Sequence, residues 1–139
     1  PAAQLALAHQ NGVVKTRSAY SMQETVDRIK RDIAAKNIKL CDVIDQARLA
    51  KDAGIDLNPS TLIIFGNPPL GTQFLTAAPE SGLDWPVRLL VYQDEAGQVW
   101  TAHSDFGWIA RRHNIKNRTS QFKMASEVIA SIISSTGAQ

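Results

Sequence analysis

The chain has 139 residues, of which 44% are hydrophobic and 20% are charged, as is usual for one packed domain. Its one cysteine, Cys41, excludes an internal disulfide, and no apolar run approaches the roughly 18 residues of a membrane helix. The net charge of +2 is too small to predict binding to nucleic acid or to a membrane, so neither is an expected partner.

Residues 1–11 are expected to form a flexible lead before a single domain at residues 12–139. Ala6-Leu7-Ala8 has the small-x-small pattern that signal peptidases cleave. We therefore expect a periplasmic or secreted protein, with the cytoplasm as the alternative.

The first regular segment is Val13–Ser18, which is short, β-branched and typical of a strand. Ser21 and Glu24 then form a capping box, which predicts a helix that ends near Asn37. Apolar residues at helical spacing give this helix one buried face: Met22, Val26, Ile29 and Ile33. A second strand is expected at 38–44. Strand, helix and strand in this order predict a right-handed crossover and a parallel pair.

Asp45 can cap a second helix at 46–53, which Gly54 would end. The run Leu62–Phe65 contains no polar residue and predicts a strand buried on both faces at the centre of the sheet. After a proline-containing loop, a short helix is expected at 72–78.

The second half predicts a late β-hairpin, with strands at 87–92 and 98–102 joined by the turn Asp94–Gly97. Helices follow at 107–113 and at 120–134. The last helix should bury one stripe: Phe122, Ala125, Ile129, Ile132 and Ile133. These elements predict an α+β two-layer sandwich, with a mixed, mostly five-stranded sheet and helices on one face. We expect its core to contain Val26, Ile29, Ile33, Ile63, Phe65, Leu89 and Val91.

The loop Gly66–Thr72 has the outline of a phosphate-binding loop, but its residues contradict that chemistry. Pro68 and Pro69 have no backbone N–H, and Thr72 stands where a lysine is needed. A rigid turn after a buried strand is still a good place for a small molecule. We expect a ligand cleft here, with polar groups from Asn67 and Thr72 and with Arg17 and His103 as neighbours. Asp105 completes the five candidate binding residues.

His103 and Asp105 could form an oriented acid–base pair. Alternatively, Asp105 or Ser104 caps the following helix and His103 is a partly exposed structural residue. Cys41 lies in a predicted strand, where it is either a small buried hydrophobe or a nucleophile that uses His103 as its base. The basic residues near the C-terminus are interpreted as a solvated connection between helices: Arg111, Arg112, Lys116, Arg118 and Lys123.

The segment Asn58–Pro68, with the sequence Asn-Pro-Ser-Thr-Leu-Ile-Ile-Phe-Gly-Asn-Pro, and the following Gly71-Thr72 resemble the signature of a bacterial and archaeal family called domain of unknown function 302. Arg17-Ser18 and Trp85-Pro86 fit the same family. The resemblance implies a two-layer α+β fold that commonly pairs as a homodimer, and it implies no established activity, cofactor or catalytic residue.

Two positions depart from that family. Its members often carry a histidine after the aspartate of the second strand and a methionine after the Gly-Thr, where this chain has Gln46 and Leu75. A His/Met ligand pair for copper or haem is therefore missing, and we expect no metal site and no cofactor.

These observations favour an uncharacterised binding or assembly module over an enzyme. We expect it to form a homodimer and to have room for a small molecule. An enzyme that uses His103, Asp105 or Cys41 is the alternative. For the homodimer, Trp85, Trp100 and Trp108 are the candidate contacts, because aromatic residues are enriched at interface cores. We expect the hairpin, as an exposed sheet edge, or the last helix to form that contact.

Overall fold

The structure, a computed structural model, describes residues 11–138, so the expected lead lies outside the described residues except for Asn11. The strands are β1 (Val13–Arg17), β2 (Lys39–Asp45), β3 (Ser60–Gly66), β4 (Val87–Gln93) and β5 (Val99–Ser104). The helices are α1 (Met22–Ala35), α2 (Gln46–Asp52), α3 (Pro68–Ala77), the 3-10 helix η1 (Pro79–Asp84), α4 (Phe106–Arg112) and α5 (Thr119–Ser134). The predicted α+β class and its five strands are confirmed.

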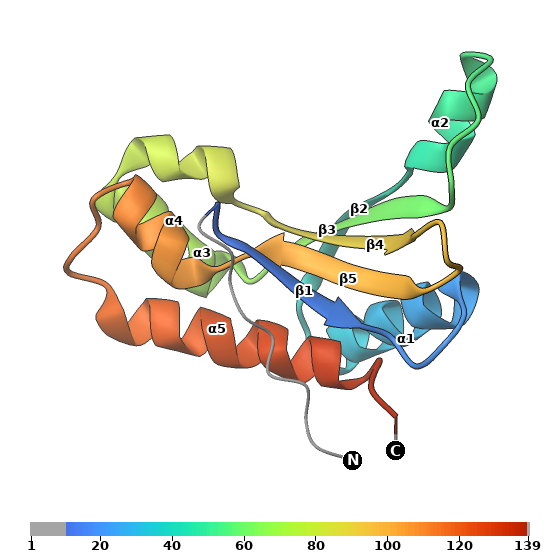
Figure 1. The fold of residues 1–139 in the computed structure, drawn as a ribbon. Coiled ribbons are helices and arrows are strands. Elements are labelled where there is room, and N and C mark those ends of the chain that lie inside the picture. The colour runs from blue at the N-terminus through green and yellow to red at the C-terminus, as the bar shows by residue number, and fades with distance from the viewer. Residues whose placement is uncertain (1–10, 139) are drawn as a thin grey trace.

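All strands belong to one sheet in the order β1-β5-β4-β3-β2 (Figure 1). Every pairing in it is antiparallel, so the predicted mixed sheet and parallel first pair are wrong. The reason is that β1 and β2 never meet. After α1, the chain enters the sheet at the edge opposite β1, and the long connection through α2 then turns it back as β3. The β4–β5 hairpin lies inside the sheet and is not an exposed edge; the edges are β1 and β2.

The two faces of the sheet are in different environments. Helices α1 and α5 lie against one face (Figure 1), where Ile63, Leu89 and Val91 have no exposed surface. The opposite face is covered by no helix of the described residues, and its side chains in β3, β4 and β5 are only half-buried. The strand β3 was therefore predicted wrongly as buried on both faces: Ile63 and Phe65 are buried, whereas Leu62 and Ile64 are not.

The core joins the helix-covered face to α1 and α5, and all seven residues predicted for it belong to one buried cluster. The predicted stripe of α5 is buried as a whole. At one end of the sheet, α3 packs on α5 through the stacked rings of Phe74 and Phe122, whose centroids are 4.1 Å apart.

Local signals place most helix ends. Ser21 caps α1 by accepting a hydrogen bond from the Glu24 N–H at 3.2 Å, and Asn37 has the left-handed φ of 55° that ends the turn. α3 begins at Pro68, four residues before the predicted start. The two prolines occupy its first positions, where no backbone N–H is needed.

Candidate functional site

A broad groove of about 1350 Å³ lies between the β1 edge of the sheet and α5. Three of the five residues predicted for a binding site line it: Arg17, His103 and Asp105. Val14, Val99 and Ile129 are among the residues that give it apolar walls. The antiparallel pairing of β1 with β5 brings residues of the two strands together at this edge, because Val14 lies opposite His103.

His103 is the titratable side chain at the end of β5. Its Nδ1 lies 2.9 Å from the Ser104 carbonyl oxygen, so the ring has a fixed orientation and a protonated Nδ1. Burial lowers the pKa of His103 below its ordinary value of 6.5, against smaller opposing effects of the Ser104 carbonyl and the Asp105 carboxylate. The imidazole is therefore neutral at pH 7.

Asp105 has a structural role. Its Oδ2 accepts a hydrogen bond from the Trp108 N–H at 2.9 Å, which caps α4. The capping alternative stated for this residue is therefore confirmed. No bond joins it to the His103 ring, whose Nδ1 is directed to a backbone carbonyl.

Asn67 and Thr72 lie away from the groove. Asn67 caps α3 by accepting a hydrogen bond from the Leu70 N–H at 3.4 Å, and Thr72 is exposed on that helix. The cavity beside the Gly66–Thr72 loop measures about 30 Å³, room for about one water molecule. The cavity at this loop is lined by Asn67 but not by Thr72, Arg17 or His103, and it is too small for the small molecule expected there.

The glycines of this loop instead accommodate Trp85, a relationship that the sequence analysis missed. A Cβ atom added to Gly71 would lie 1.8 Å from Nε1 of the Trp85 indole, and one on Gly66 would lie 2.8 Å from Cζ2. Gly12 makes room for Trp108 in the same way, because a Cβ atom added to Gly12 would lie 2.4 Å from Cγ of the Trp108 indole. Both glycines of the spacing that resembles a phosphate-binding loop thus make room for one indole ring.

Cys41 is exposed on the edge strand β2, which contradicts its interpretation as a buried hydrophobe. It cannot use His103 as a base, because β3 and β4 separate β2 from β5, a span of about 14 Å at the usual strand spacing. Within residues 11–138, no group of three or more His, Cys, Asp or Glu side chains is placed to hold a metal ion.

A partly buried polar cluster around Asp84 connects η1 to the end of α4. Asp84 binds Arg112 Nη1 at 2.9 Å and His113 Nε2 at 2.5 Å, which gives His113 a structural role. Arg118 donates to the Gln73 carbonyl at 3.1 Å. Two of the basic residues near the C-terminus therefore hold the fold together, and sequence spacing could not reveal their partners.

The open face is defined here as the half-buried apolar side chains opposite the helices. It contains a row of directly paired residues across four strands: Ile44, Leu62, Leu90 and Ala102. Ile64, Tyr92 and Trp100 extend it on both sides. The ammonium of Lys15 lies 4.6 Å from the Trp100 ring centroid and 5.6 Å from that of Tyr92.

Asp94 fixes the Trp100 ring on this face. Its Oδ2 accepts a hydrogen bond from Trp100 Nε1 at 2.9 Å, and its Oδ1 accepts from the Gln98 N–H at the same distance. The indole N–H, followed by the Gln98 N–H, lowers the pKa of Asp94. The large aromatic ring is thus held in one orientation on the surface.

Fold and surface together define a class: a two-layer α+β domain with one helix-covered sheet face, one open apolar face, and a groove along one edge. The chain belongs to the family described as Domain of unknown function DUF302, which matches residues 14–134. This confirms the resemblance seen in the Asn58–Thr72 signature.

Solved and curated relatives agree with this assignment. A crystal structure of an uncharacterized conserved DUF302 protein from Bacillus stearothermophilus has a TM-score of 0.81 and 15% identity, over 90% of this chain and 98% of that chain, and so supports the fold. Fluoride-specific ion channel FluC 1 of Brucella suis is 36% identical over 105 residues, or 76% of this chain and 41% of that protein. FluC 2 of Brucella melitensis matches at the same identity over 39% of its length. The chain spans about two fifths of the length of these curated relatives. Among residues 11–138, no helix has the length and apolarity needed to cross a membrane.

Proposed function

We propose that this domain is a non-enzymatic assembly module that pairs with a second copy of itself through the open face. One observation carries the proposal: the middle of a five-stranded sheet presents apolar side chains that no described element covers. A sheet normally buries each apolar face against another layer, and contiguous exposed apolar surface is typical of interaction sites.

Trp100 has the properties of an interface anchor. It lies on the open face, Asp94 orients it, and Lys15 packs over its ring. An ordered aromatic residue contributes large contact area at little cost in rotamer entropy. Trp85 and Trp108 instead pack against glycines within the chain, so Trp100 is the tryptophan proposed for the interface.

The proposed contact differs from the one expected from sequence. The hairpin takes part through the face of β4 and β5, which supply Leu90, Tyr92, Trp100 and Ala102, and not through an exposed edge. The last helix is excluded from this contact because it packs on the other face of the sheet.

An enzymatic role has less support. The sequence candidates do not converge: Cys41 lies at the β2 edge, Asp105 caps a helix, and the His103 ring is directed to a backbone carbonyl. Two converging titratable groups in one pocket are a minimal requirement for acid–base or nucleophilic catalysis.

The Brucella relatives suggest a setting for such a module. Their names describe fluoride channels, and this chain resembles a part of them. Because residues 11–138 contain no helix suited to span a membrane, we propose that such a domain serves chain pairing and not ion conduction.

Sedimentation velocity at micromolar concentration tests the proposal. The wild type should sediment as a dimer and Leu90→Lys as a monomer, because the lysine places an unpaired charge in the contact. Met124→Lys is the matched control, since Met124 is 53% exposed on α5 and lies off the open face. Circular dichroism should show that both variants are folded. A monomeric wild type, or a dimeric, folded Leu90→Lys, would refute the proposal.

A further inference from the structure

We infer that, in the proposed dimer, the projecting segment at residues 46–59 of each copy docks at the far end of its partner's open face, against Leu83 and Arg88. This segment, called the arm, consists of α2 and the loop that leads to β3. The inference rests on the proposed pairing through the open face and specifies how the two copies fit.

The arm is well formed but poorly packed. No residue of α2 is buried, although Asp45 caps its first turn at the Arg48 N–H and Gly54 ends it with a φ of +77°. A helix of seven residues is too short to be stable without packing. The large apolar side chains of the arm are unusually exposed: Leu49 is 60%, Ile55 61% and Leu57 51% exposed. This surface lacks a partner within residues 11–138.

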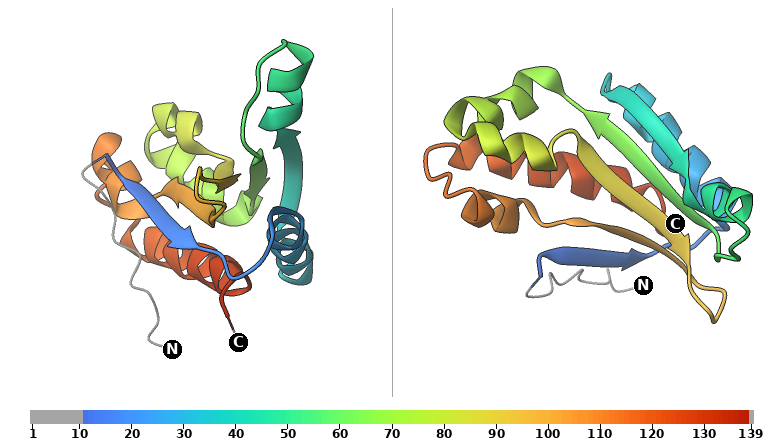
Figure 2. Two further views of the ribbon diagram at one scale, coloured as in Figure 1. Left: turned by 45° about the vertical axis from the view of Figure 1, so that its right-hand side comes forward. Right: turned by 90° about the horizontal axis from the view of Figure 1, so that it is seen from above.

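The arm and η1 rise at opposite ends of the open face. Figure 1 shows α2 projecting beyond one end of the sheet, on the side away from α5, with η1 above the other end. A second view of the arm confirms this projection (Figure 2). On η1, Leu83 is 64% exposed. The open face thus lies between two projecting elements, the arm and η1, and each of these presents exposed apolar side chains.

A twofold axis between two copies would bring the arm of each copy to η1 of the other. When a second copy faces the first across an axis perpendicular to the view of Figure 1, its arm descends at the end where η1 stands. The same operation brings the first arm to the second η1, so the contact is reciprocal and closed. Both exposed apolar surfaces are then covered by a single partner, which is why we commit to a second copy.

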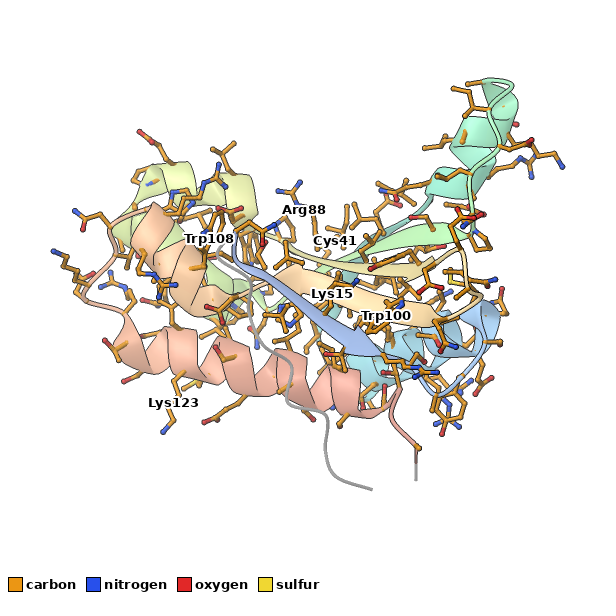
Figure 3. The ribbon with its side chains drawn as sticks, in the orientation of Figure 1. Lys15, Cys41, Arg88, Trp100, Trp108 and Lys123 are labelled. Carbon is orange, nitrogen blue, oxygen red and sulfur yellow. The ribbon has the colours of Figure 1, made fainter. Side chains whose placement is uncertain are left out.

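Charge complementarity supports the same pairing. In the arm, the exposed Asp56 lies between Ile55 and Leu57, and it has no ion-pair partner within residues 11–138. Arg88 projects from the open face on the side away from α5 (Figure 3), and its guanidinium donates to the Leu83 carbonyl. Within residues 11–138 Arg88 forms no ion pair. In the proposed dimer the carboxylate of Asp56, between Ile55 and Leu57 at the tip of the arm, therefore meets the guanidinium of Arg88.

A charge-reversal experiment tests the reciprocal contact. Asp56→Arg and Arg88→Asp are both exposed changes, so the fold should be retained. Each variant alone places two like-charge pairs in the dimer and should raise its dissociation constant about tenfold or more. An equimolar mixture should recover dimers of near wild-type affinity, because one contact of the mixed dimer is native and the other is the reversed pair.

The matched controls are Glu127→Arg and Lys123→Asp on α5, which lies on the opposite side of the sheet (Figure 3). Each should dimerise like the wild type. Variants that dimerise normally, or a mixture that stays monomeric, would overturn the arm contact. If Leu90→Lys still dissociates the dimer in that case, pairing through the open face survives and only the arm contact fails. A wild type that is monomeric, with an arm held by some other protein, would overturn both.

Discussion

Single residues in this domain are constrained mainly by two tryptophans and the glycines beneath them. The Trp85 ring occupies the space that side chains at positions 66 and 71 would fill, and Trp108 does the same above position 12. Gly12 also has a φ of +81°, so two independent constraints apply there. A motif that resembles a ligand loop is therefore explained by packing.

Replacement of Gly71 by alanine tests this explanation. The added Cβ must displace Trp85, so Gly71→Ala should lower the free energy of unfolding by about 2 kcal/mol or more. Gly82→Ala is the control, because a Cβ there meets only Leu75 at 3.9 Å. Chemical denaturation measures both. Equal stability of the two variants would show that Trp85 moves freely and that the glycine spacing has another cause.

His103 gives a prediction for pH. Its pKa is lowered in the folded state, so the unfolded chain binds more protons between pH 6.5 and the folded pKa, and stability falls as the pH falls through this window. His103→Gln should reduce the loss of unfolding free energy between pH 7.5 and 5. Denaturation curves at the two pH values measure it. An unchanged loss in the variant would contradict a buried neutral imidazole.

Among the elements, the short helices depend on their caps. α2, α3 and α4 have ten residues or fewer, and each begins at a side chain that accepts a backbone N–H: Asp45, Asn67 and Asp105. The first backbone N–H groups of a helix have no intrahelical partner, so in such a short helix one side-chain cap is a large share of the local stability.

Two substitutions of Asp105 distinguish a capping role of this residue from a role that needs its negative charge. Asp105→Ala should cost about 1 kcal/mol of stability, and Asp105→Asn should restore most of it because its amide oxygen can also accept the Trp108 N–H. Thermal unfolding of the two variants provides the comparison. If asparagine were as harmful as alanine, the negative charge and not the cap would be what this position requires.

At the scale of the whole molecule, one layer of helices covers one face of one sheet. The core lies between them, and Ile63 on β3 is fully buried in it. Within residues 11–138 nothing packs on the open face or on the tip of the arm, so stability of the single chain and pairing of two chains are separable properties.

Ile63→Ala tests the core at this scale. Removal of a buried isoleucine side chain should cost ~2–5 kcal/mol, which calorimetry would register as a lower thermal midpoint. Leu57→Ala, on the exposed arm, should leave the stability of the monomer nearly unchanged. A midpoint that Ile63→Ala does not move would contradict the position of this residue in the core.

The sequence by itself determined the elements and the family. Capping residues, apolar periodicity and turn glycines are local signals, so α1, α5 and the β4–β5 hairpin were predicted within a few residues, and the Phe-Gly-Asn-Pro block indicated the right family. The buried stripe of α5 followed from the helical period alone.

Only the tertiary structure decided strand order, partners and the location of the groove. Local patterns do not say which strands pair, so the first two strands were placed side by side although they are opposite edges. The same limit split the predicted site: β1–β5 pairing gathers Arg17, His103 and Asp105, while Asn67 and Thr72 belong to α3. The contacts between indole rings and glycines, and the uncovered sheet face, depend on residues that are far apart in the chain. Local sequence patterns therefore cannot predict them.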